Sequence, residues 1–235
     1  MKISHPVYIL KVLLLTILTL ASTIMAAQEH TPYFCNKDNT TLEYTRTTAG
    51  GEIKWYHTMA IKEVNRSTDT TAINYTSYIQ NRKHKPYYGK QPAELTATVT
   101  EQGVTLNVAE SVAAVFRTLL PSNTRITSTG GESSLPTNMV PGDTLPNVNA
   151  SVKALGMTMK ITVTQRQALR FDTITTPAGT YHCIVIREKK VEKGMGRNRH
   201  TISDTWYSKE TGMVRHDTYN LQLELQTSEI LTDIH

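Results

Sequence analysis

The feature that most constrains the fold is an alternation of apolar and polar residues with a period of two, which recurs along most of the chain. It is clearest over residues 157–164, MTMKITVT, and it recurs over residues 53–62, IKWYHTMAIK. Successive side chains of a β-strand point to opposite faces of its sheet, so this period is typical of strands with one buried face. Thr, Val, Ile and Tyr, which favour strands, are also abundant. The chain is therefore expected to be mainly β.

Turn signals separate the candidate strands at short intervals. They are Gly50-Gly51, Gln102-Gly103, Pro177-Ala178-Gly179 and Glu210-Thr211-Gly212. Short turns join antiparallel neighbours. Residues 110–120 have apolar positions at helical spacing, and Pro121 ends that pattern. We expect a curved antiparallel sheet or half-barrel of about ten strands with one short helix.

The first 27 residues predict an export signal. Lys2 and Lys11 supply positive charge, residues 12–20 (VLLLTILTL) form an apolar run, and Met25-Ala26-Ala27 offers a cleavage site. The run is too short for a good membrane span. We therefore expect residues 28–235 to form a single exported β-rich domain, periplasmic or secreted, with no transmembrane span after cleavage.

Charge and cysteine content limit the partners and the redox state. Residues 28–235 hold 23 basic and 20 acidic side chains, which gives no reason to expect nucleic acid. Cys35 and Cys183 are the two cysteines, and an oxidising compartment favours a disulfide between them. Two buried free thiols are the alternative.

No motif for catalysis, metal binding or cofactor binding is present. The chain lacks Gly-x-Ser-x-Gly, His-Glu-x-x-His, Cys-x-x-Cys and a phosphate-binding glycine loop. His182 and Cys183 are adjacent on a predicted strand, so their side chains point to opposite faces and the histidine cannot activate the thiol. The sequence therefore predicts no catalytic residue, no metal and no cofactor.

Residues 127–148 lack both the helical and the strand period. A run of this length is usually a functional lid or a packed loop, and both interpretations stay open. If the sheet holds an apolar ligand, adaptable methionines beside this segment would line the mouth. The candidate ligand-binding residues are Met157, Met159, Trp55 and Met139.

Two basic segments are candidates for contact with an anionic surface. Residues 81–90 (NRKHKPYYGK) mix cations with aromatic residues, and residues 190–199 form a predicted glycine-containing loop. Such patches can bind phosphate, anionic glycan or a membrane surface, although solvated hairpin tips have the same composition. The residues concerned are Arg82, Lys83, Lys85, Tyr87, Tyr88, Lys193, Arg197 and Arg199.

An ordered set of short motifs resembles the TapB-like family of exported bacterial proteins. The motifs are Leu135-Pro136, residues 141–145 (PGDTL), residues 176–181 (TPAGTY) with Cys183, residues 204–207 (DTWY) and residues 212–215 (GMVR). The resemblance implies an envelope location and a curved antiparallel sheet, with no catalytic residues to carry over. It also implies, by fold analogy with lipoprotein-carrier half-barrels, an apolar ligand.

Three functions follow as expectations. The first is a non-enzymatic envelope protein that binds a lipid or other amphiphile on its curved sheet. The second is a structural or assembly module that contacts envelope proteins or anionic glycans, for which an exposed edge strand such as residues 221–225 would be evidence. The third is a hydrolase, which would need titratable residues gathered in one cleft.

Overall fold

The computed structural model describes residues 31–235, so the predicted export signal at residues 1–27 lies outside the described residues. The described chain is mainly β, as predicted, with one helix, α2 (Val108–Leu119). The strands are β1 (Thr41–Thr48), β2 (Ile53–Arg66), β3 (Thr71–Asn81), β4 (Ala93–Thr100), β5 (Gly103–Asn107), β6 (Ile126–Gly130), β7 (Glu132–Pro136), β8 (Thr144–Leu145), β9 (Val148–Ala154), β10 (Met157–Thr176), β11 (Gly179–Gly194), β12 (Arg197–Ser208), β13 (Gly212–Tyr219) and β14 (Leu225–Ile234).

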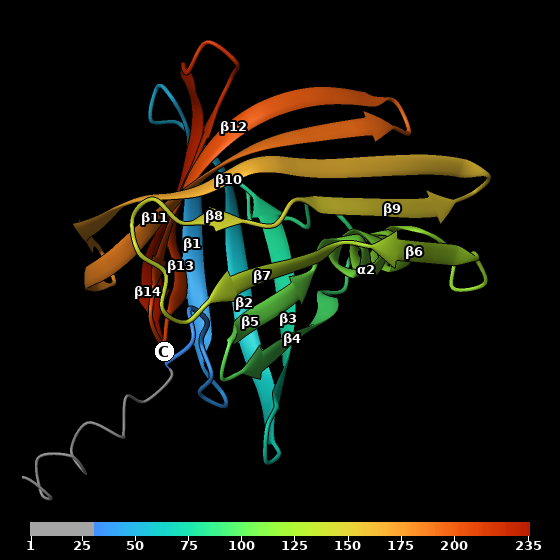
Figure 1. Ribbon diagram of the computed structural model, residues 1–235. Coiled ribbons are helices and arrows are strands. Elements are labelled where there is room, and N and C mark those ends of the chain that lie inside the picture. Colours follow the sequence, from blue (N-terminus) through green and yellow to red (C-terminus); the bar gives the residue numbers. More distant parts are fainter. Residues whose placement is uncertain (1–30) are drawn as a thin grey trace, which may run out of the picture. The chain divides into compact units, whose positions relative to one another are not determined.

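All fourteen strands belong to one antiparallel sheet, which curls until it nearly closes into a barrel (Figure 1). The order is β6-β9-β10-β11-β12-β13-β14-β1-β2-β3-β4-β5-β7, with β8 beside β10. The end strands β6 and β7 are consecutive in the chain and are separated only by Gly131. Arg166 on β10 ties the ends together, because its guanidinium donates to Ser133 Oγ on β7 and to the Pro146 carbonyl, each at 2.9 Å. The first and last strands, β1 and β14, are neighbours.

The long hairpin of β10 and β11 accounts for much of the curvature. These strands have 20 and 16 residues, and their register shifts twice, between Thr164 and Gln167 and between Ala168 and Arg170. Gln165, in the first shift, has a φ of 52°. A β-bulge bends its strand and increases the local twist. The two bulges therefore turn a long, otherwise regular hairpin into a curved wall.

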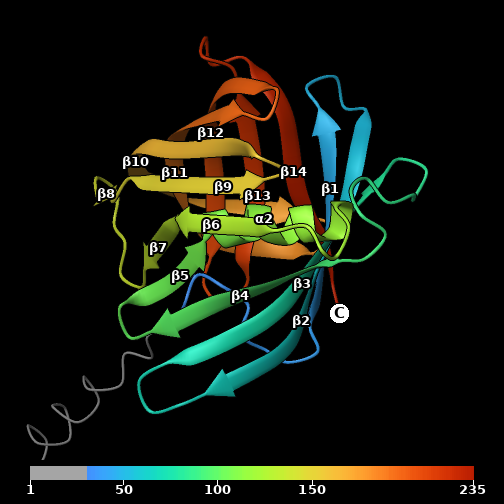
Figure 2. The ribbon, with the colours of Figure 1, turned by 90° about the vertical axis from the view of Figure 1, so that its right-hand side faces the viewer.

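Two buried clusters form the core. The main cluster covers the inner face of the sheet and includes Tyr44, Val214 and Leu231. The second lies where α2 covers β9 and β10, with Ala109 and Ala113 against strand residues such as Val152; Figure 2 shows α2 behind β6. The small alanines let the helix approach the sheet closely. Asn107 caps the helix, accepting a hydrogen bond from the Glu110 amide.

Three expectations about the elements were wrong. The sheet has fourteen strands rather than about ten. Residues 127–148 are not structureless, because they contribute β6, β7, β8 and the first residue of β9; strands of two to five residues are too short to show a period. Residues 190–199 are not a loop, since β11 and β12 continue to a turn at Met195-Gly196.

The segment 221–225 is not an edge strand. Residues 221–224 form a turn, and Leu225 begins β14, which is paired on one side with β13 and on the other with β1. The alternating leucines of this segment do not mark the buried face of a strand. Leu221 and Leu223 lie in the turn and are 47% and 53% exposed.

The disulfide predicted between Cys35 and Cys183 is absent, because both cysteines are free thiols. Both lie in the main core cluster, where each packs as a small apolar side chain. Burial, with a contribution from Asp172, raises the pKa of the Cys183 thiol to about 12. The thiol is therefore protonated and unreactive at neutral pH. Over residues 31–235, no helix has the length and apolar character needed to cross a membrane.

The junction between the two sheet ends gives the first prediction. Gly131 has a φ of 91°, and a Cβ there would lie 2.5 Å from the Ala109 amide nitrogen. We expect Gly131→Ala to lower the free energy of unfolding by about 2–4 kcal/mol, combining left-handed strain with overpacking. Urea denaturation measures the loss.

Gly142→Ala is the matched control for this substitution. Gly142 has a φ of 100°, but a Cβ there would meet no atom within 4 Å. Only the backbone cost of about 1–2 kcal/mol should appear. Equal losses for the two variants would contradict a role for the close contact at Gly131.

Candidate functional site

The inner face of the sheet changes from apolar to polar along its strands. On β1, Tyr44 is in the core, and Arg46 is the next residue on the same face. On β14, which runs in the opposite direction, Leu231 is fully buried and Glu229 precedes it on the same face. The register places Arg46 opposite Glu229. On β13, His216 lies opposite Glu229 as well. A polar band therefore crosses neighbouring strands directly beside the main core.

Glu229 is the centre of this band. Its side chain is only 7% exposed. One carboxylate oxygen accepts from His57 Nδ1 at 2.9 Å, and the other accepts from the Arg46 guanidinium at 3.1 Å. Burial opposes ionisation of Glu229, but the hydrogen bond and charge of His57 and the charge of Arg46 outweigh it and lower its pKa to about 2. The carboxylate is therefore ionised at neutral pH.

His57 links Glu229 to a serine. The Nε2 atom of His57 lies 2.9 Å from Ser77 Oγ on β3. The series Ser77–His57–Glu229 has the hydrogen-bond order of a hydrolytic triad. The backbone around Ser77 differs from that of a hydrolase nucleophile. Ser77 lies in a regular strand, opposite Met59 on β2 and Ala93 on β4, whereas a nucleophile elbow holds its serine at a sharp strand-to-helix turn.

His216 is a neutral member of the band. Its Nδ1 atom lies 2.8 Å from Thr205 Oγ1 on β12. Burial, assisted by the positive charge of Arg46, lowers the pKa of His216 to about 4. Folding therefore places an uncharged imidazole beside the Arg46–Glu229 pair.

Trp55 lies next to this band, toward the open end of β2. It is paired with Arg46, whose Cζ atom lies 4.7 Å from the centroid of the indole ring. A bulge between Ile53 and Trp55 leaves Lys54 unpaired with β1, and its Nζ atom lies 5.1 Å from the same ring. The Trp55 Nε1 atom is buried and has no hydrogen-bond partner. Every other buried side-chain nitrogen or oxygen in residues 31–235 has a partner. A buried donor without an acceptor is costly.

Lys54, which lies over the Trp55 ring, also feels the charge of a cation from a distant strand. Burial lowers the pKa of Lys54, and the positive charges of Arg46 and Arg199 lower it further. Arg199 is on β12, which is separated from β2 by three intervening strands, so the curl of the sheet brings the two side chains together.

Within residues 31–235, neither Lys54 nor Arg199 has a carboxylate within 4.0 Å. Arg199 lies opposite Glu192 in the register of β11 and β12, and its charge helps to lower the pKa of that carboxyl. Arg46 is paired with Glu229. Among the described residues, Lys54 is therefore the cation of this group without a carboxylate partner.

The connection between β3 and β4 supplies aromatic groups to the same place. The Tyr87 ring lies 5.4 Å from the Trp55 ring, and the Tyr88 ring lies 5.0 Å from that of Tyr87. Tyr87 is 46% exposed, so this side of the cluster is open to solvent. We refer to Arg46, Lys54, Trp55, Tyr87 and Arg199 as the Trp55 site.

The four candidate ligand-binding residues do not come together. Met139 lies in the main core and Met159 in the cluster under α2, where they are 3% and 5% exposed. Met157 is 51% exposed beside the turn between β9 and β10. Only Trp55 is at the site described here.

The two basic segments, by contrast, converge in part. Tyr87 from the first segment lies against the Trp55 ring, and Tyr88 packs edge-on against Tyr87. The charge of Arg199 from the second segment acts on Lys54. Arg197 pairs with Glu192 at 3.4 Å. Arg82, Lys83 and Lys85 are exposed on the β3–β4 connection, and Lys193 is exposed on β11.

Sequence reasoning missed Arg46, Lys54, His57 and Glu229 as site residues. A signal was present for Arg46, which continues the alternation of Leu42 and Tyr44 and is therefore a cation at a position with an apolar pattern.

His57 gave the same signal, since it stands between Trp55 and Met59 in the alternating pattern and is most simply interpreted as a core or rim histidine. Its contact with Glu229 could not be predicted, because it depends on the register of β14, β1 and β2.

Comparisons with known proteins agree with this fold. A "putative exported protein with YmcC-like fold" from Bacteroides fragilis superposes with a TM-score of 0.71 at 16% identity, covering 87% of this chain and 99% of its own. A "putative lipoprotein" from Parabacteroides distasonis gives a TM-score of 0.73 at 17% identity, with coverage of 88% and 100%. At this identity the likeness shows a shared fold. No curated protein matches the chain.

The DUF3108-like family model matches residues 37–231, and the chain belongs to that family. The match spans nearly all of the described sheet. It does not confirm the TapB-like name that the short motifs suggested.

The half-buried imidazole of His216 gives a prediction about pH. Its folded pKa of about 4 lies below its usual 6.5, so the unfolded chain binds more protons between these values. The contribution of neutral His216 to the free energy of unfolding is therefore fully present above pH 6.5. It is lost as the pH drops toward 4, by on the order of 2–3 kcal/mol. Urea denaturation at pH 7.5 and pH 5 should show the fall, and His216→Gln should largely remove it; an unchanged pH dependence in that variant would contradict the assignment.

Proposed function

We propose that this protein is a non-enzymatic exported envelope protein that binds an anionic amphiphile at the Trp55 site. The observation that carries the proposal is the buried Trp55 Nε1 donor without an acceptor, on a ring that Arg46 and Lys54 contact, with the charge of Arg199 acting on Lys54. An acidic group bound there would reduce the repulsion between the cations, and it would accept from the indole once the side chains that bury Nε1 move aside. The exposed Tyr87 ring offers an apolar surface for the adjoining part of the ligand.

Export is the part of this proposal that rests on sequence and on relatives. Residues 1–27 have the pattern of an export signal. The two similar structures carry the descriptions exported protein and lipoprotein. The second expectation, an assembly module, has no comparable support, because the predicted edge at residues 221–225 is a turn leading into a strand paired on both sides.

Native mass spectrometry of the protein purified from its own host envelope tests the function directly. We expect a discrete adduct that organic solvent removes and that carries a carboxylate, phosphate or sulfate group. The Lys54→Gln, Arg199→Gln double variant should lose the adduct, since two of the three cations of the site are then absent. A wild-type spectrum showing the polypeptide alone would contradict the proposal.

A binding measurement with a defined probe separates charge from apolar contact. Dodecyl phosphate should bind and change Trp55 fluorescence, whereas neutral dodecyl maltoside should not. The double variant should bind dodecyl phosphate at least about tenfold more weakly, from two lost charged contacts. Lys37→Gln is the control, because Lys37 is 67% exposed and pairs with Glu210 instead; an equal loss in that variant would show non-specific attraction.

The Ser77–His57–Glu229 series favours one alternative, a serine hydrolase. A fluorophosphonate probe labels activated serines and so distinguishes the two functions. Under the leading proposal Ser77 stays unlabelled, because it lies in a regular paired strand. The opposite outcome is labelling that is lost in both Ser77→Ala and His57→Gln, together with hydrolysis of p-nitrophenyl butyrate. That result would contradict the binding function and assign the protein as a hydrolase.

A further inference from the structure

The outer face of the sheet carries a row of lysines near the ends of β9, β10 and β11. Met159 and Ile161 face α2, so Lys160 between them faces outward, as does Lys153 on β9. Lys160 lies directly opposite Lys193 in the register of β10 and β11. Like charges at such positions are destabilising.

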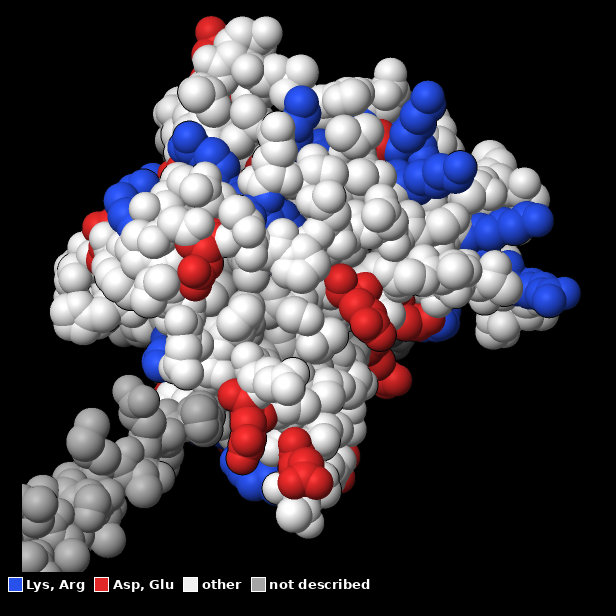
Figure 3. All heavy atoms as spheres, viewed as in Figure 1, with Lys and Arg blue, Asp and Glu red and all other residues white. Residues whose placement is uncertain are grey.

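No carboxylate compensates this row. In the part of the chain that the structure describes, Lys153, Lys160 and Lys193 form no ion pair within 4.0 Å. The sequence has no Asp or Glu between Asp143 and Asp172. Basic side chains gather over this end of the sheet in the view of Figure 3. The arrangement is unfavourable for the isolated fold and favourable beside an anionic partner.

The turn next to this row has an unusual apolar residue. Leu155 and Gly156 form the two-residue connection between β9 and β10, with φ values of 51° and 76°. Positive φ at both positions is typical of a type I′ turn, for which Asn-Gly is strongly preferred. Here a leucine takes the strained first position and is 61% exposed, and Met157 beside it is 51% exposed.

The neighbouring hairpin repeats the pattern. Met195 and Gly196 join β11 to β12 with φ values of 52° and 75°. The two hairpin ends lie side by side, since a Cβ on Gly194 would fall 2.0 Å from the Thr158 carbonyl oxygen. Met195 packs partly against the cluster under α2, so Leu155 is the more exposed of the two.

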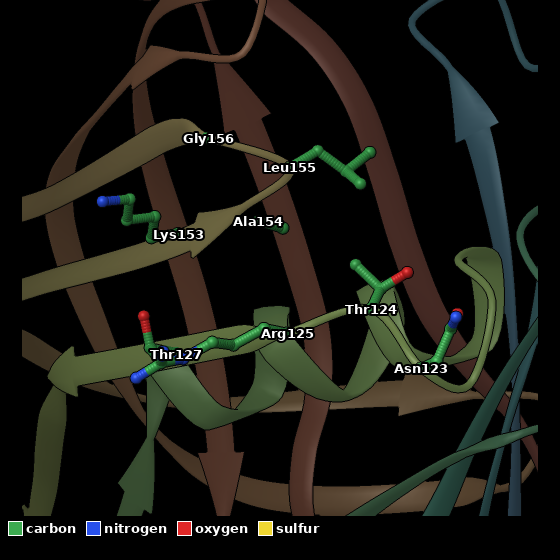
Figure 4. Close-up of a pocket in the computed structure, with 8 residues that line it drawn as sticks. All are labelled: Asn123, Thr124, Arg125, Thr127, Lys153, Ala154, Leu155 and Gly156. Carbon is green, nitrogen blue, oxygen red and sulfur yellow. The ribbon is translucent and has the colours of Figure 1, made fainter.

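A hollow of about 600 Å³ adjoins the first turn, between residues 123–127 and residues 153–156 (Figure 4). Arg125 and Lys153 line it together with Leu155. The hollow therefore combines two cations with the exposed leucine, in a size suited to a lipid headgroup.

We propose that this end of the sheet docks on the surface of an anionic phospholipid bilayer. Leu155 and Met157 enter the boundary between headgroups and acyl chains, and Lys153, Lys160, Lys193 and Arg125 contact the phosphates around them. Exposed apolar side chains beside a row of lysines match both parts of such a surface. A soluble anionic partner would use the lysines and leave the leucine without a role.

Sedimentation with lipid vesicles tests the docking, using protein purified from its host envelope. We expect binding to vesicles of phosphatidylglycerol and phosphatidylcholine, weakened by salt, and little binding to phosphatidylcholine alone. Lys160→Gln and Lys193→Gln should each weaken binding about fivefold. Equal binding to both vesicle types would overturn the proposal.

Leu155→Asn is the decisive variant, because Asn-Gly suits the turn and the fold should be at least as stable. We expect binding to phosphatidylglycerol vesicles to fall at least about tenfold, from the lost apolar insertion. Leu223→Asn is the matched control, since Leu223 has a φ of 63° and is 53% exposed at a turn without the lysine row. Unchanged binding in Leu155→Asn, or an equal loss in Leu223→Asn, would overturn the proposal.

The docking surface and the Trp55 site are separable. Lys54→Gln with Arg199→Gln should keep vesicle binding, and Leu155→Asn should keep dodecyl phosphate binding. Loss of vesicle binding in the former variant would assign membrane contact to the Trp55 site and overturn docking through the hairpin end.

Discussion

The return of the sheet onto itself is the constraint on which the rest of the structure depends. The strands at the two ends of the sheet are consecutive in the chain, and Gly131 between them also lies against the start of α2. Because the ends meet, one face of the sheet becomes an interior. Side chains from strands that are not neighbours, such as Lys54 and Arg199, can then act on one another.

This interior is not uniformly apolar, and its polar part is costly. Glu229 is ionised while almost fully buried, and its carboxylate is stabilised by hydrogen bonds from His57 and Arg46. Buried ion pairs contribute little to stability compared with apolar packing of similar volume. The band also leaves a tryptophan donor without an acceptor. A chain selected for stability alone would fill this position with the apolar residues that cover the rest of the inner face, which is why we connect the band with ligand binding.

The sequence predicts what depends on local pattern. Period-two alternation identified the strands around residues 53–62 and 157–164, and the apolar stripe ended by Pro121 identified the helix. The prediction was wrong where strands were too short to show a period, as in β6 to β8. It was also wrong where the ends of long strands consist mainly of polar residues, as in β11 and β12. For the site, Trp55, Tyr87, Tyr88 and Arg199 were found as isolated candidates. Their convergence with Arg46 and Lys54 depends on strand register and curvature, which leave no mark on any one segment.

The pairing of β1 with β14 has a consequence for biogenesis. The amide of Thr41 donates to the carbonyl of His235 at 2.6 Å, and the amide of His235 donates to Thr41 at 3.0 Å. β1 therefore lacks one of its two partners until β14 has been made. Contacts of such high sequence separation form slowly, because a long loop must close first. The sheet is therefore complete only after β14 has been made, and until then β1 exposes an unpaired edge that offers its backbone groups to another chain.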